Sequence, residues 1–285
     1  EKNMWDDLFE NEINGLVTET REQYELTNYK GALKFGLYDF TGARDFYREA
    51  TKAAGIGMHA DLVKRYVELQ ALMVNVVAPH WSEHIWLEVL KKDETIQNAL
   101  FPDAPATKAH LTAAREYVRG TSSSITSAEG AQLKRMQKGK NTSYNPREAK
   151  KLTIFMADKY PTWQDTIIET VRKNFNNLVI DIGAISKAIP KAESKRAMPF
   201  VQTLKRSLES GIDSTTVFER KLAFDEQKVL TGMVPNLKQT VQKCAVVEVI
   251  LIEEGGKSGK VVGGTEGVVI GEERKELPAS AEGAV

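Results

Sequence analysis

One long apolar stretch, from Met58 to Leu90, constrains the fold of this chain more than any other feature of the sequence. Its apolar residues recur at helical spacings of four, three, four and three: Leu62, Tyr66, Leu69, Met73 and Val76. A second line of valines widens this face, as expected of a helix at the centre of a bundle. Ala78-Pro79 then ends the helix, because a residue before proline avoids helical geometry, and Pro79 suits the start of a second helix.

Comparable helical patterns precede and follow this stretch. They predict helices that begin near Trp5, near Tyr29 and at Ala109, the last ending at Val118. About five helices joined by short links describe an up-and-down bundle. We therefore expect residues 1–120 to form a helical bundle.

The composition changes at Gly120, where a serine-rich, weakly periodic region begins. Between Lys134 and Lys151 the only acidic residue is Glu148, against seven basic residues: Lys134, Arg135, Lys138, Lys140, Arg147, Lys150 and Lys151. Because Gly139 and Asn145-Pro146 disfavour a helix, residues 121–150 are predicted to form an exposed, basic, flexible linker.

The remainder of the chain has a mixed α/β pattern over residues 151–252. Strands are predicted at Leu152–Ala157, Phe218–Phe224 and Cys244–Ile252. Helices are predicted after Pro161, around Met198 to Leu208, and from Asp225 to near Lys243 with an interruption around Gly232 and Pro235. Residues 253–285 are glycine-rich and charged, so we expect most of this tail to be disordered.

Several short motifs follow one another in a fixed order along the chain. They are Tyr29 to Lys34, Ala43 to Arg48, Gly57-Met58-His59, Ala78-Pro79-His80, Glu83 to Trp86, Phe101-Pro102, Tyr160 to Gln164 and Lys195 to Phe200. Together they resemble the leucyl-tRNA synthetases, and the eukaryotic cytosolic branch most of all. The resemblance runs from about the start to about Ile252. It implies a mainly α fold: an up-and-down helical bundle of the class I synthetase anticodon-binding type, followed by a smaller mixed α/β domain, in the C-terminal portion of such an enzyme.

The resemblance also implies a chemistry and a set of partners. The parent enzyme would use ATP and Mg to adenylate leucine and transfer it to tRNA. The family's H-I-G-H and K-M-S-K-S signatures do not occur in this sequence, so we assign no catalytic residue, metal or cofactor to this stretch. The expected partners are the leucine-acceptor tRNA and the rest of the synthetase chain, with no membrane and no DNA.

Two groups of cations are candidates for binding tRNA phosphates, where displaced counterions favour binding. They are Lys30, Lys34, Arg44 and Arg48 on the polar side of the second helix, and Lys134, Arg135, Lys138 and Lys140 in the linker. The alternative is an ordinary polar helix face and a solvated linker. Tyr144 is the only aromatic residue in the basic stretch, so a platform for stacked bases is not expected there.

Bulk composition limits the class of protein. Lysine plus arginine and aspartate plus glutamate both number 39, so any basic surface must be local. The single cysteine, Cys244, cannot form an internal disulfide and suits a reducing compartment. No apolar run approaches about 18 residues. We expect a soluble, cytoplasmic protein and, because the chain opens on Glu1 without an initiator methionine, a piece of a longer one.

Two other motifs suggest enzymes. His80 to His84 fits the H-x-x-E-H pattern of inverted zinc metalloproteases, but Pro79 starts the helix there and a third ligand is required. The favoured interpretation is structural: His80 and Glu83 bond backbone groups while Trp86 packs inward. Gly256-Lys257-Ser258 resembles the end of a P-loop, but Leu251 replaces the required glycine.

Two alternatives to the leucine enzyme stay open from the sequence. The chain could be the matching portion of an isoleucine, valine or methionine enzyme, although these lack the Tyr160 to Gln164 and Lys195 to Phe200 motifs. It could also be a non-enzymatic helical scaffold that binds proteins, which would show no affinity for tRNA.

Overall fold

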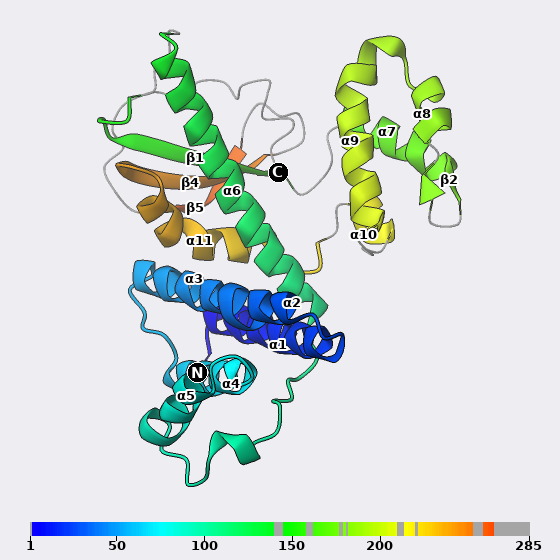
Figure 1. The fold of residues 1–285 in the computed structure, drawn as a ribbon. Helices are drawn as coiled ribbons and strands as arrows, with labels where there is room; N and C mark the ends of the chain where they lie inside the picture. Colours follow the sequence, from blue (N-terminus) through cyan, green and yellow to red (C-terminus); the bar gives the residue numbers. More distant parts are fainter. Residues whose placement is uncertain are drawn as a thin grey trace. The chain divides into compact units, whose positions relative to one another are not determined.

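The structure is a computed structural model that describes residues 2–139, 145–157, 162–176, 179–180, 182–209, 214–219, 222–252 and 259–264. The chain divides into two compact units (Figure 1). The first comprises residues 1–151 and 228–246, and the second comprises residues 152–227 and 247–285. The predicted division into residues 1–120, 121–150, 151–252 and 253–285 differs from these units, and as a statement about separable domains it stays a prediction.

Helices make up the first unit (Figure 1). In chain order they are α1 (Met4–Glu25), α2 (Tyr29–Leu33), the π-helical segment η1 (Lys34–Asp39), α3 (Phe40–Ala53), α4 (Ala60–Val74), α5 (Pro79–His84), the π-helical segment η2 (Ile85–Val89), the short 3-10 helix η3 (Ile96–Asn98), α6 (Ala109–Gln137) and most of α11 (Glu226–Thr240). The prediction of a mainly α chain that begins with a helical bundle is confirmed.

Helix α1 begins with a complete capping box. The Asn3 side chain accepts hydrogen bonds from the backbone N–H groups of Trp5 and Asp6, and the Asp6 carboxylate accepts one from Asn3 N at 2.9 Å. These bonds satisfy backbone donors that have no partner inside the first helical turn. The cap fixes where α1 starts.

The second oxygen of the Asp6 carboxylate reaches another helix. Buried Tyr47 on α3 donates its hydroxyl proton to Asp6 and accepts a hydrogen bond from His59 N at 2.8 Å. One tyrosine hydroxyl therefore connects the start of α1, the middle of α3 and the residue before α4.

The bundle core is aromatic and contains the predicted face of α4. The rings of Phe9 and Tyr47 stack at 4.3 Å between centroids, and those of Phe40 and Tyr66 stack at 4.6 Å. Leu62, Tyr66, Leu69 and Met73 are buried as predicted. Val76 is 61% exposed, contrary to the predicted stripe, because α4 ends two residues earlier at Val74.

The helix that starts at Pro79 buries its tryptophan. Trp86 packs against Ala71 and Ile96, and its indole Nε1 donates to the carbonyl oxygen of Glu94 at 2.9 Å. The inward orientation predicted for Trp86 is confirmed. The partner on α4 is Ala71, which lies beside the predicted Tyr66 to Met73 line.

A π-helical segment interrupts the predicted second helix. Gly36 within it lies so close to α1 that a Cβ atom there would come within 2.9 Å of the Thr20 methyl group, which explains the glycine. A π turn holds one residue more than an α turn, so it rotates the following helix by about 100°. Arg44 and Arg48 are therefore rotated about the helix axis away from Lys30 and Lys34, whereas a regular helix would place all four residues on one side.

Helix α6 corrects the predicted break at Gly120. It runs unbroken for 29 residues, about 43 Å, through the serine-rich segment. One glycine in a helix costs only about 1 kcal/mol relative to alanine, and no proline interrupts this stretch. Residues 121–137 therefore belong to a helix and not to an irregular linker.

The second unit contains short helices and most of the strands. They are β1 (Lys150–Ala157), α7 (Thr162–Lys173), β2 (Phe175–Asn176), β3 (Val179–Ile180), α8 (Ile182–Ala188), α9 (Lys191–Glu209), α10 (Ser214–Glu219), β4 (Cys244–Ile252) and β5 (Gly259–Gly264). β1, β4 and β5 form one sheet in the order β1-β4-β5, with β4 and β5 antiparallel, and β2 and β3 form an antiparallel pair.

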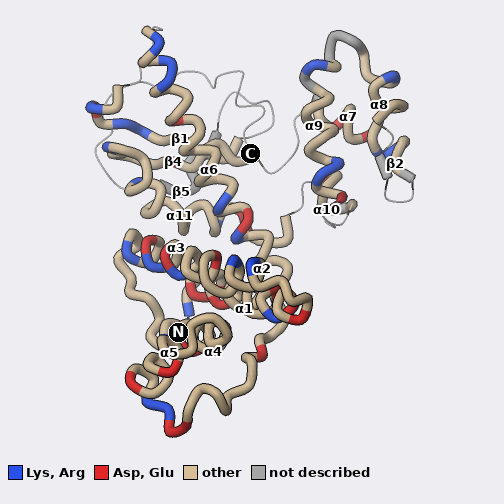
Figure 2. The backbone as a smooth tube through the Cα atoms, in the orientation of Figure 1, with Lys and Arg blue, Asp and Glu red and all other residues tan. Residues whose placement is uncertain are grey.

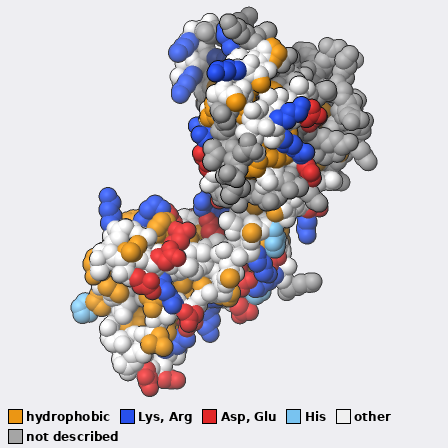
Figure 3. Space-filling model, turned by 90° about the vertical axis from the view of Figure 1, so that its right-hand side faces the viewer, with side chains coloured by type: hydrophobic (Ala, Val, Ile, Leu, Met, Phe, Trp, Pro, Cys, Tyr) orange, Lys and Arg blue, Asp and Glu red, His pale blue; other side chains and the backbone are white. Residues whose placement is uncertain are grey.

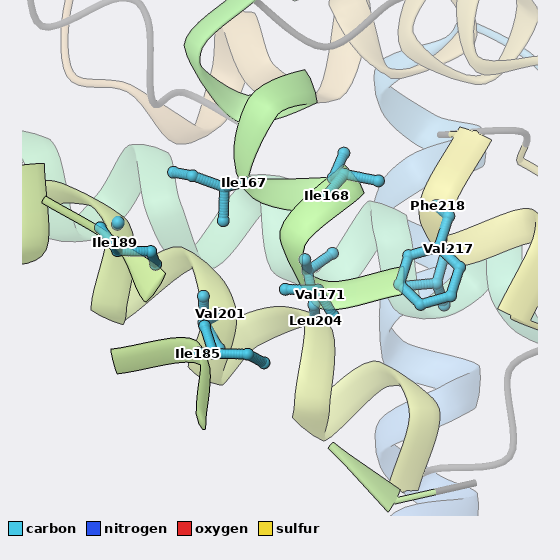
Figure 4. Close-up of a cluster of buried hydrophobic side chains, with 10 residues drawn as sticks. Ile167, Ile168, Val171, Ile185, Ile189, Val201, Leu204, Val217 and Phe218 are labelled. Carbon is cyan, nitrogen blue, oxygen red and sulfur yellow. The ribbon is translucent and has the colours of Figure 1, made fainter. Parts of the chain in front are cut away.

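The helices of this second unit surround an apolar core of their own (Figure 4). Ile167 and Val171 of α7 point toward Val201 and Leu204 of α9, all of them buried, and Ile185 of α8 belongs to the same cluster. The helices predicted after Pro161 and around Met198 to Leu208 are thus confirmed.

Two predictions for the later part of the chain are wrong. Phe218 lies in helix α10 and not in a strand, because its ring packs into the helical core. Helix α11 is continuous through Gly232 and Pro235, and a Cβ atom on Gly232 would collide with the Met4 side chain. Within the tail, Gly259–Gly264 forms β5, because it pairs with β4, and the expectation that most of the tail is disordered stays a prediction. Gly256-Lys257-Ser258 and residues 265–285 lie outside the described residues.

Candidate nucleic-acid interface

The first predicted cationic group begins on α2. Lys30 is exposed. Lys34 lies 2.6 Å from the Asp39 carboxylate, and its ammonium group is 4.0 Å from the centroid of the Phe35 ring. Glu19 of α1 is close enough for Lys34 to lower its pKa, although burial, the larger effect, raises that pKa. Lys34 is therefore surrounded by carboxylates and offers little net positive charge to a phosphate.

The remaining cations of this group also lie beside acids. The Arg44 guanidinium is 2.7 Å from the Asp45 carboxylate and 5.7 Å from the centroid of the Tyr66 ring. Arg48 lies 3.5 Å from Asp45 and 3.3 Å from Glu49. Acidic and basic side chains are mixed over the bundle in the lower part of Figure 3. This face is consequently close to neutral.

Helix α6 is anchored to the bundle through its first half. The buried Arg115 guanidinium lies 2.5 Å from the Glu12 carboxylate of α1 and 3.9 Å from the centroid of the Phe46 ring. Arg119 binds the other oxygen of Glu12, also at 2.5 Å. Burial lowers the pKa of Arg115, and the Glu12 charge counteracts that shift. These arginines were not predicted, because nothing in the sequence shows that Glu12 lies opposite them.

The second predicted cationic group begins at the other end of α6. Lys134 and Arg135 lie in its last turn and Lys138 is its C-cap, and all three side chains are exposed. Among the residues that the structure describes, none forms an ion pair with these three. Cations at a helix C-terminus also stabilise the helix dipole, which is the structural explanation for them. Lys140, the fourth predicted residue, lies outside the described residues.

The segment that leads into β1 adds further basic residues, as Figure 2 shows in blue near the end of α6 and at the start of β1. Arg147 is exposed. The Lys150 ammonium lies 3.3 Å from the Glu129 carboxylate of α6. The Lys150 ammonium therefore helps to attach this segment to α6.

The H-x-x-E-H motif serves the fold. The Glu83 carboxylate accepts a hydrogen bond from Ile96 N at 3.0 Å, as the structural interpretation predicted for this residue, while His80 and His84 are exposed. No group of three or more His, Cys, Asp or Glu side chains able to hold a metal ion occurs within the described parts of the chain. Within the same described parts, no helix is long and apolar enough to cross a bilayer.

Comparison with known sequence families identifies both halves of the chain. The family described as anticodon-binding domain of tRNA ligase matches residues 6–144. The family described as leucine–tRNA ligase, RagD-binding domain, matches residues 156–218. The first match covers the bundle from Asp6 onward and all of α6, and the second runs from the end of β1, at Met156, to Phe218 in α10.

Individual relatives agree with these matches. The chain is 48% identical over 260 residues to the cytoplasmic leucine–tRNA ligase of Neurospora crassa and 42% identical over 261 residues to that of Saccharomyces cerevisiae. Each alignment covers 90% of this chain and 23% of the relative's length. The enzyme of Pongo abelii is 33% identical over 83% of this chain and 20% of its own length. The chain therefore belongs to the leucine–tRNA ligase family, and it corresponds to a C-terminal portion of such an enzyme.

Proposed function

We propose that this chain is the tRNA-docking portion of a leucine–tRNA ligase. The observation that carries the proposal is the exposed group Lys134, Arg135 and Lys138, which has no acidic partner among the described residues and lies within the anticodon-binding match. Such cations bind phosphates without reading sequence. Affinity for tRNA should therefore depend on salt and vary little with sequence.

The chemistry of the whole enzyme is part of the same proposal. The parent protein charges leucine-acceptor tRNA with leucine in the cytoplasm, as the names of the relatives suggest, and uses ATP and Mg, as the family resemblance implies. We assign none of these steps to residues of this chain. Leucine-dependent pyrophosphate exchange by the chain alone should be undetectable, and measurable exchange would contradict this assignment.

Titration of the full chain with leucine-acceptor tRNA tests docking. We expect saturable binding at about 50 mM salt, with a slope of log affinity against log salt of about −0.7 to −0.9 per phosphate contacted. A tRNA for another amino acid, used as control, should bind with similar affinity. No measurable binding at low salt would contradict the docking function and favour a protein-binding scaffold.

The match over residues 156–218 favours a second candidate function. We propose that this segment binds a partner protein, with RagD as the candidate that the family name supplies. The segment has its own apolar core, so it can present a surface of fixed shape. Calorimetric titration of the full chain with RagD should give saturable binding. Alanine substitutions of the exposed residues Lys187 and Lys195 should alter that binding and leave tRNA affinity unchanged; an absence of heat with RagD would contradict this candidate.

A further inference from the structure

A lysine distant in the sequence joins the basic residues at the end of α6. Lys243 lies between α11 and β4 in the left-handed backbone region, with φ of 53°. Its carbonyl oxygen accepts a hydrogen bond from Lys150 N at 2.9 Å, and its ammonium donates to the carbonyl oxygen of Arg147 at 2.7 Å. The two bonds hold residues 147–150 against Lys243.

The same segment is also attached to α6 through the Lys150–Glu129 pair. Three parts of the first unit are thereby connected: α6 at Glu129, about two turns before its end, the segment before β1, and the start of β4. We call the exposed cations on them the α6-end surface: Lys134, Arg135, Lys138, Arg147 and Lys243. Acids on the connected segments have partners of their own: Glu129 pairs with Lys150, and the Glu148 carboxylate accepts a hydrogen bond from the Asn145 side chain at 2.8 Å.

The chemistry of this surface suits a phosphate backbone more than unstacked bases. Residues 134–139 and 145–151 include no aromatic side chain, so the described part of the surface offers no ring for a base to stack on. Single-stranded nucleic acids usually depend on such stacking. Double-stranded RNA is bound mainly through its shape and backbone, and its two strands present phosphates at fixed positions. Cations held on a helix end and a strand start can match such a fixed pattern.

We propose that the α6-end surface binds the phosphate backbone of a double-stranded RNA arm, and that Lys243 is the positioning residue that holds Arg147 within it. The inference rests on the proposed tRNA docking and specifies the part of the RNA that this surface takes. Lys243 keeps Arg147 beside the cations of α6, so that more than one phosphate is bound at once.

Fluorescence anisotropy with two RNA probes tests the ligand class. The full chain is titrated with a duplex of about 16 base pairs, the span of a typical double-stranded RNA contact, and with one of its strands alone. At about 50 mM salt the duplex should bind at least about tenfold more tightly, with a steeper dependence on salt. Equal affinities, or a preference for the single strand, would overturn the inference, whereas only a failure to bind tRNA at all would overturn the docking function.

Variants of Lys243 test its positioning role. Lys243→Asn keeps a residue that tolerates the left-handed conformation and removes the ammonium. The matched control is Lys91→Asn, because Lys91 is also an exposed lysine with φ of 55° and belongs to the bundle. Lys243→Asn should reduce the magnitude of the salt slope for the duplex by at least about 0.9, the value of one phosphate contact, and Lys91→Asn should not change it.

Two further variants separate positioning from general damage. Lys243→Arg should retain most of the wild-type slope of log affinity against log salt, because arginine keeps a cationic donor. Arg147→Gln should weaken duplex binding by itself but add little in the Lys243→Asn background, because Arg147 is then already misplaced. If the two effects add fully, or if Lys243→Asn binds as the wild type does, Lys243 has no positioning role and that part of the proposal fails.

Discussion

The two ends of helix α6 carry the same kinds of side chain in opposite environments. Near its start, Arg115 and Arg119 share the carboxylate of Glu12, and Arg115 also covers the Phe46 ring. At its end, Lys134 and Arg135 are exposed, with no ion pair to another described residue. The first pair fastens the helix to the bundle, and the second is available to a ligand.

This difference shows that a count of cations in a sequence does not locate a binding surface. A buried charge needs a partner, so Arg115 near the start of α6 is committed to the fold, and exposed Arg119 shares the same carboxylate. Exposed ion pairs contribute about 0–1 kcal/mol, and their acids reduce the local positive charge. Lys34, Arg44 and Arg48 form ion pairs of this exposed kind, so the positive charge around them is reduced, whereas the α6-end surface keeps its charge.

The largest expected effect is on the anchored end. Glu12→Ala leaves the buried Arg115 guanidinium without its counter-charge, so it should lower the free energy of unfolding by about 3–5 kcal/mol. Urea denaturation of the full chain, followed by circular dichroism, measures this. The double variant Glu12→Leu, Arg115→Met replaces the pair with apolar groups and should recover much of the loss. A loss below about 1 kcal/mol for Glu12→Ala would show that α6 is not anchored by this pair.

A comparable loss of stability is expected when an uncharged side chain inside the bundle is truncated. Trp86→Ala removes a ring buried against Ala71 and Ile96 together with its bond to Glu94, and such truncations cost about 3–5 kcal/mol. His84→Ala, two residues away and exposed, should change stability by less than about 0.5 kcal/mol. Thermal unfolding compares the two. A larger effect of His84→Ala, with stabilisation of the wild type by zinc, would revive the metal interpretation of the H-x-x-E-H motif.

Ionisation of Tyr47 on α3 should have a smaller effect on the free energy of unfolding, and this effect depends on pH. Burial, and then its bond to Asp6, raise the pKa of Tyr47 from 10.0 to about 12. Between these values the unfolded chain has released the proton that the folded chain keeps, so the free energy of unfolding should fall as pH rises through this window.

Tyr47→Phe provides the comparison. It removes this contribution to the pH dependence, but it should cost about 1–3 kcal/mol at neutral pH, because the Asp6 carboxylate loses a buried donor. Urea denaturation of both proteins at about pH 9 and pH 11 gives the two slopes. An unchanged slope in Tyr47→Phe would show that this hydroxyl does not resist ionisation in the folded state.

The smallest effect is expected for the paired cations of α3. Replacing Arg44 and Arg48 together with glutamine should change the free energy of unfolding by less than about 1 kcal/mol, because their ion pairs are largely exposed. Affinity for tRNA should change by less than about threefold, since these cations already face Asp45 and Glu49. A large loss of affinity would place the RNA on the α2–α3 face instead.

The local sequence was sufficient to predict a helix where apolar residues recur on one face without interruption. Leu62, Tyr66, Leu69 and Met73 gave α4, and Pro79 gave the start of the next helix. The prediction failed at Val76 because periodicity alone does not show that the helix ends at Val74. It also missed η1, since a π turn depends on tertiary contacts such as that of Gly36 with Thr20.

Glycine and proline were given too much weight as breakers. Gly120 and Gly232 lie inside α6 and α11, and Pro235 lies inside α11 as well, where packing of the helix offsets a local cost. Phe218 reads as a strand residue by propensity, but it lies in α10 with its ring in the helical core. Tertiary packing outweighs propensity at Gly232 and Phe218, whereas exposed Gly120 costs its helix only about 1 kcal/mol.

The candidate site could be predicted only in part from the sequence. The basic stretch beginning at Lys134 could be recognised from its charge alone. The neutralisation of Lys34 by Asp39 and the addition of Lys243 could not, because both depend on which residues meet in space. Residues 96 positions apart give no local signal of their contact.

A salt titration of tRNA binding by two matched triple variants tests the central claim most directly. One carries Lys134→Ala, Arg135→Ala and Lys138→Ala, and the other carries Lys30→Ala, Lys34→Ala and Arg48→Ala; both are compared with the wild-type chain. The account predicts that the first variant loses about 2–3 units from the magnitude of the slope of log affinity against log salt, and that the second loses less than about 0.5. An equal loss in both, or a larger loss in the second, would contradict the claim that the end of α6 is the RNA-binding surface.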